Sequence, residues 1–159
     1  MRKPPELKPI SQILAITSHA EMVYEMYLHV LGKIRDDDIE SLTEVERTVV
    51  CTLLLEAEVN NGGFDQYFFN SSGNWAKYTF VALTNIGASH TAALFRRALA
   101  VFPEMPSADR KIRWEQLDSL GDPAIFSQLD REFYEGRDDL SELLYTYIQK
   151  NLAAFGRAG

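Results

Sequence analysis

The fold is decided by residues 56–75, which read EAEVNNGGFDQYFFNSSGNW. Asn and Gly tolerate the left-handed backbone of a helix C-terminus, so we expect Asn60-Asn61-Gly62-Gly63 to end the preceding helix. A short helix over residues 64–70 and a turn over residues 71–74 follow. Three aromatic side chains of the short helix share one face that can dock onto a core, namely Phe64, Tyr67 and Phe68.

The polar side chains of this stretch have two interpretations. In the structural one, Gln66 and Asn70 lie four residues apart, and their amides satisfy unpaired groups where helix ends meet. In the functional one, Glu56 and Asn61 join these two amides to line a small polar pocket. We favour the structural interpretation, because unusual backbone and aromatic spacing usually serve packing.

Two capping boxes mark helix starts before this stretch. Thr43 and Glu46 form one of them, and the helix that they open runs to Val59. Its middle is apolar nearly all round, which is typical of a buried helix, so Cys51 is expected to be an inert buried thiol. The second box, Ser18-His-Ala-Glu21, precedes apolar residues at steps of three and four up to Ile34.

The rest of the chain also has helical spacing. Further helices are predicted over residues 75–86, 89–102, 108–120, 123–134 and 139–155. Asp122-Pro123 is typical of a helix start, with a capping residue followed by proline at the first helical position. We therefore predict an all-α fold of seven or eight helices with short connections. Residues 10–159 would form one domain, preceded by a flexible proline-bearing arm over residues 1–9.

Composition excludes several classes of protein. The chain has 159 residues, of which 46% are hydrophobic and 25% charged, as in ordinary globular proteins. Its single cysteine excludes a disulfide framework and a cysteine-rich zinc site. The sequence has neither an apolar run long enough to span a membrane nor a signal-peptide pattern. We expect a cytoplasmic protein without a metal or cofactor.

Charge is distributed unevenly along the chain. The formal net charge is −7, which argues against direct binding of nucleic acid. Residues 36–70 carry nine acidic side chains and a single basic one, Arg47, and residues 115–159 carry nine acidic and four basic ones. Residues 71–114 have the opposite balance, with six basic side chains and two acidic ones.

The stretch around the glycine pair resembles the signature of a bacterial DNA-mimic family, formerly listed as a domain of unknown function. The family pattern is an acidic helix, then N-G-G-F-x-Q-Y-F-x-N, then a turn with glycine. The matching residues are Asn61, Gly62, Gly63, Phe64, Gln66, Tyr67, Phe68, Asn70 and Gly73. The resemblance covers about residues 43–150. It implies an acidic, non-enzymatic dimer that occupies the DNA-binding surface of a transcription regulator.

A DNA mimic places carboxylates where a regulator's Arg and Lys side chains otherwise meet phosphates. The candidate phosphate substitutes are Asp36, Asp37, Asp38, Glu40, Glu44, Glu46, Glu132, Glu135, Asp138, Asp139 and Glu142. The expected partner is a basic DNA-binding protein such as a helix-turn-helix regulator. Because its two recognition helices lie about 34 Å apart, a homodimer of the mimic would span them best.

Two other functions stay open. The same electrostatics suit an immunity or antagonist protein that binds a basic toxin or nuclease. A small-ligand-binding or enzymatic domain would instead use the polar residues between Glu56 and Asn74 and would require a pocket with a strongly perturbed Glu56. The sequence contains no Gly-x-Ser-x-Gly, phosphate-loop or His-Glu-x-x-His motif, and we assign no catalytic residue.

Overall fold

The computed structural model describes residues 7–36, 38–122 and 124–156. Within these residues the secondary structure is helical without a strand, so the all-α prediction is confirmed. Seven of the helices have seven residues or more, in agreement with the predicted seven or eight. In chain order the elements are α1 (Ile10–Leu14), α2 (His19–Leu31), the 3-10 helix η1 (Ile39–Ser41), α3 (Glu44–Phe69), the 3-10 helix η2 (Ser71–Trp75), α4 (Ala76–Asn85), α5 (Ser89–Leu99), α6 (Arg110–Leu120), α7 (Ser127–Tyr134), α8 (Leu140–Lys150) and α9 (Leu152–Phe155).

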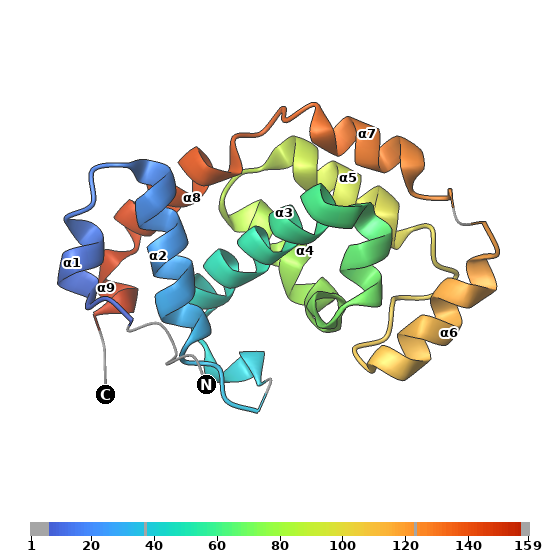
Figure 1. The fold of residues 1–159 in the computed structure, drawn as a ribbon, viewed down its shortest axis with the longest axis horizontal. Helices are drawn as coiled ribbons and strands as arrows, with labels where there is room; N and C mark the ends of the chain where they lie inside the picture. The colour runs from blue at the N-terminus through green and yellow to red at the C-terminus, as the bar shows by residue number, and fades with distance from the viewer. Residues whose placement is uncertain (1–6, 37, 123, 157–159) are drawn as a thin grey trace.

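The long helix α3 organises the fold. It crosses the middle of the molecule, with α2 and α8 on one side and α6 on the other (Figure 1), and it also contacts α4, α7 and α9. The predicted capping box starts it: Thr43 Oγ1 accepts from the Glu46 backbone N–H, and Glu46 Oε2 accepts from the Thr43 N–H at 2.9 Å. The apolar middle of α3 is buried, and Cys51 is only 1% exposed.

The glycine pair makes a kink rather than the predicted helix end. Asn60 and Asn61 remain helical, and the backbone departs from helical angles only at Gly62 (φ −157°, ψ 21°) and Gly63 (φ 76°, ψ −176°). The helix resumes at Phe64, whose N–H donates to Asp130 Oδ1 of α7 at 2.8 Å. A carboxylate from a distant helix therefore caps the second half of α3, and this lets the chain bend without ending the helix.

The aromatic face predicted after the kink lies in the core. Phe64, Tyr67 and Phe68 are completely buried. Tyr67 packs edge-to-face against Phe95 of α5, with ring centroids 5.5 Å apart, and Phe68 packs against Phe102 at 4.9 Å. Such pairs stabilise a core beyond the area that they bury. The short second half of α3 thus carries the aromatic centre of the molecule.

Several predicted boundaries are wrong by a few residues. The 123–134 helix begins at Ser127, after a turn in which Asp122 Oδ1 accepts from the Ala124 N–H, and Pro123 lies outside the described residues. The 139–155 helix is interrupted at Asn151 and continues as α9. Helix α1 was not predicted, residues 71–75 form a 3-10 helix where a turn was expected, and residues 1–6 of the predicted arm lie outside the described residues. No helix in the described part of the chain is long and apolar enough to cross a membrane.

Candidate functional site

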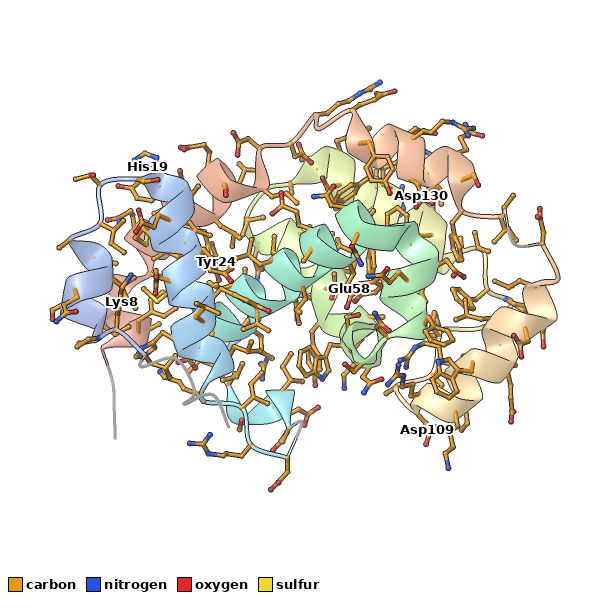
Figure 2. All side chains as sticks on the ribbon, in the orientation of Figure 1. Lys8, His19, Tyr24, Glu58, Asp109 and Asp130 are labelled. Atoms are coloured by element: carbon orange, nitrogen blue, oxygen red, sulfur yellow. The ribbon has the colours of Figure 1, made fainter. Side chains whose placement is uncertain are left out.

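The amides of the signature stretch gather around a carboxylate that the sequence analysis did not single out. Glu58 Oε2 accepts from Gln66 Nε2 at 2.6 Å and from Asn70 Nδ2 at 2.9 Å, and Ser72 Oγ donates to Glu58 Oε1 at 3.3 Å. Asn61 joins the network by donating to Gln66 Oε1 at 3.0 Å. Figure 2 shows Glu58 on α3 near the centre of the molecule. The network ties both halves of α3 to η2, so its role in the fold is to fix the kink.

Glu56 is not part of this network, which corrects the predicted polar pocket. It lies on another face of α3 and lines a cavity of about 130 Å³ together with His90 and Asp138. Burial and the nearby Asp139 carboxylate raise the pKa of Glu56. A concave site with a perturbed Glu56 therefore exists, but Gln66 and Asn70 bind Glu58 elsewhere.

A buried arginine holds the end of the signature stretch. Arg113 of α6 is completely buried, and its guanidinium donates to the carbonyl oxygens of Phe68 at 2.6 Å, Asn70 at 2.9 Å and Ser107 at 2.5 Å. A Cβ at Gly73 would lie 2.6 Å from Arg113 Nε, so the glycine of the motif makes room for this side chain. Sequence reasoning missed Arg113, because nothing in its local spacing distinguishes it from Arg110 and Lys111, which are less buried.

The first acidic cluster, residues 36–46, is partly neutralised by the fold. Asp36 and Asp38 are exposed, whereas Asp37 lies outside the described residues. Glu40 accepts hydrogen bonds from Lys77 and from the Tyr78 hydroxyl. The two remaining members differ in exposure: Glu44 is exposed and accepts from Asn85 Nδ2, while Glu46 is 5% exposed and pairs with Lys33 Nζ at 2.6 Å.

The second acidic cluster, residues 132–142, is also partly engaged. Arg97 donates twice to Glu132, at 2.5 and 2.9 Å, and lowers the pKa of that carboxyl to about 2. Asp138 Oδ2 caps α5 by accepting from the Thr91 N–H at 2.7 Å. The others have local partners: Glu135 pairs with Arg137, Asp139 caps α8 and Glu142 contacts His19.

The two clusters do not form one continuous surface. Figure 1 shows η1 and the start of α3 at the lower edge of the molecule, and α7 and the start of α8 at the upper edge. The structure therefore brings the members of each cluster together but keeps the clusters apart.

A third group of carboxylates lies at the end of α3. Asp65, Asp118 and Asp122 line a groove of about 330 Å³, and within the described residues none of them has a Lys or Arg partner. Sequence reasoning did not group them, because they come from separate segments. Their only shared signal is that each falls in a segment with excess negative charge. Among all the residues that the structure describes, no three His, Cys, Asp or Glu side chains are placed to hold a metal ion.

Comparison with known proteins identifies one relationship. A family model described as DMP19-like protein matches residues 40–151, which is more than half of the chain. The matched region begins in η1 and includes all of α3, so it contains the kink, the Glu58 network and Arg113. No significant match was found among curated proteins or among solved structures.

Proposed function

The chain belongs to the DMP19-like protein family, and from this we propose that it is an acidic DNA mimic that binds the DNA-binding surface of a transcription regulator. Binding there would exclude operator DNA without any chemical step. The family match is the observation that carries the proposal, and the formal net charge of −7 supports it. Complementary charge on two surfaces steers their encounter and fixes the orientation of the complex.

Exposure selects which predicted carboxylates we retain. Of the first cluster we keep the exposed Asp36 and Asp38, together with Asp37 from the same run, and the outward-facing Glu40 and Glu44. We leave out Glu46, because its buried carboxylate is spent on the helix cap and on Lys33. From the second cluster we keep the exposed Glu135, Asp139 and Glu142. We leave out Glu132, which pairs with Arg97, and the half-buried Asp138, whose carboxylate caps α5.

A homodimer fits this charge distribution. Helix-turn-helix dimers read two half-sites about 34 Å apart, so a mimic must present negative charge at two places with that spacing. One copy has its two acidic clusters on opposite edges (Figure 1), whereas a two-fold dimer would repeat one cluster on the same side of the assembly. We therefore propose that one cluster per protomer contacts the regulator.

Competition with DNA tests the proposal. Regulators captured from a bacterial lysate at low salt and eluted with salt would be bound to labelled operator DNA, and displacement would be followed by fluorescence anisotropy. Displacement should weaken steeply as salt rises, because the contacts are between exposed charges. Affinity that is flat from low to high salt contradicts the proposal, and exclusive capture of a nuclease or toxin favours the antagonist alternative.

Charge reversal locates the surface. The double change Asp36→Lys and Asp38→Lys should weaken displacement at least about tenfold while leaving the helical circular dichroism unchanged, since both side chains are exposed. The matched control is Glu104→Lys with Glu115→Lys, which alters the net charge equally at two exposed positions outside both clusters. If both double variants weaken displacement of operator DNA equally, net charge alone, and not a defined surface, governs binding.

A further inference from the structure

The groove at the end of α3 combines an apolar wall with an acidic rim. It lies between the end of α3, the last turn of α6 and the segment that leads to α7. Its apolar lining includes Phe69, which is 48% exposed, and Ile125. Its rim carries the carboxylates of Asp65, Asp118 and Asp122. A groove of this kind suits a side chain that is apolar along its stem and positive at its tip.

The rim carboxylates are free to accept a ligand. In the described part of the chain, Asp65 and Asp118 accept no side-chain hydrogen bond, and Asp122 uses one oxygen for the Ala124 N–H. By contrast, Glu40, Glu46 and Glu132 are already paired with a lysine or an arginine. The last turn of α6 also lines the groove, and a helix C-terminus carries partial negative charge.

Two arginines of α6 are engaged by carbonyl oxygens and aromatic rings. The guanidinium of Arg113 is buried against backbone carbonyls. Arg110 lies over the rings of Trp114 and Phe69, with its guanidinium carbon 4.8 and 5.8 Å from the two ring centroids, and donates to the Phe69 carbonyl. Neither of these two guanidinium groups is paired with a carboxylate of the groove.

We propose, building on the function proposed above, that this groove takes an arginine side chain from the DNA-binding surface of the partner. The arginine stem would lie along Ile125, and its planar guanidinium would stack on Phe69 and hydrogen-bond to the carboxylates of Asp65 and Asp118. Arginine fits better than lysine, because its planar group is weakly hydrated, stacks on aromatic rings and pairs with two carboxylate oxygens at once. A hydrated metal ion would gain nothing from the apolar wall.

A titration without any regulator tests this directly. N-acetyl-arginine amide would be added to the isotope-labelled protein, and amide chemical shifts would be recorded. N-acetyl-citrulline amide serves as the neutral probe of the same shape. We expect saturable shifts centred on residues 65–69 and 117–125 with arginine, and at least about tenfold weaker binding with citrulline. Shifts spread evenly over all acidic segments, or equal for both probes, overturn the proposal.

Matched variants sharpen the result. Asp65→Asn with Asp118→Asn should abolish the saturable shifts at the groove, whereas Asp36→Asn with Asp38→Asn, which removes the same charge, should leave them unchanged. Equal effects of the two doubles overturn the proposal. If arginine binds the groove but no regulator is displaced from DNA, the proposed function fails and the groove assignment stands. If the variant Asp65→Asn with Asp118→Asn displaces operator DNA with the same affinity as the native protein, the groove assignment fails and the proposed function stands.

Discussion

The two ends of α3 use charge in opposite ways. At its start the buried charge is negative: Glu46 closes the helix cap and is neutralised by Lys33 of the segment after α2. At its end the buried charge is positive, because Arg113 satisfies the carbonyls of Phe68 and Asn70. The carboxylates around the start are therefore partly consumed by the fold, while those around the end remain available.

This difference shows that formal charge and available charge diverge within one chain. Residues 71–114 have six basic side chains, yet three of them are spent internally: Arg113 on backbone carbonyls, Arg97 on Glu132 and Lys77 on Glu40. The positive segment is consequently a weaker obstacle to a basic partner than its composition indicates. Conversely, residues 36–70 offer fewer free carboxylates than their nine-to-one excess indicates, because Glu40 and Glu46 are paired with lysines.

Replacing the buried Arg113 should cause the largest loss of unfolding free energy. Arg113→Met leaves carbonyl oxygens at the end of α3 without donors in a buried position, which should cost about 3–5 kcal/mol of unfolding free energy. Urea unfolding followed by circular dichroism measures this loss. Arg113→Lys keeps the charge but not the planar fork and should recover only part of it. A loss below about 1 kcal/mol for Arg113→Met would show that the cation is not what holds this end.

Adding a side chain at Gly63 in the kink of α3 should cause the second largest loss of unfolding free energy. In Gly63→Ala the new Cβ would lie 2.5 Å from Asp130 Oδ2 in a backbone conformation that only glycine adopts readily, so we expect a loss of about 2–4 kcal/mol. Gly87→Ala is the matched control, because Gly87 has the same φ of 76° but nothing within 4 Å of its added Cβ. It should lose only about 1–2 kcal/mol in the same unfolding assay. Equal losses would mean that the Asp130 contact is irrelevant.

The smallest loss of unfolding free energy is expected for a substitution of Glu46 at the start of α3. Burial raises the pKa of Glu46, but hydrogen bonds from Lys33 and Thr43 outweigh it and lower the pKa overall. A lowered pKa stabilises the folded state above the ordinary glutamate range, and this contribution is lost as the pH falls. Glu46→Gln should therefore cost about 1 kcal/mol near pH 7, and the difference from the native protein should shrink below about pH 4. A difference that does not change with pH would contradict this account.

Sequence reasoning succeeded where the determining interactions are local. The capping box at Thr43, the helical spacing and the non-helical backbone at the glycine pair all depend on residues within four positions of one another. The kink was predicted as an end because the capping carboxylate of Asp130 comes from 66 residues away. Without that partner the Phe64 N–H would have been an unpaired donor, and a helix end would have been the reasonable expectation.

Spacing alone could not have found the hub of the polar network. On a continuous helix, at about 100° per residue, Glu56 would lie about 40° from Asn70 and Glu58 about 120° from it, so the pattern favours Glu56. The non-helical backbone at Gly62 and Gly63 turns the second half of α3, and Gln66 and Asn70 meet Glu58 instead. The contact of Arg113 with the end of α3 is equally hidden from the sequence, because the carbonyls of Phe68 and Asn70 lie more than 40 residues earlier and no local pattern predicts them.

The buried thiol of Cys51 has a practical consequence. Burial raises the pKa of this thiol to about 12, and thiol reagents react with the deprotonated form. Since it is the single cysteine of the chain, a cysteine introduced at an exposed position would carry a fluorescent or spin label without background. Distances between labels on two copies would then test whether the proposed dimer forms, in the native sequence background and without first removing a core side chain.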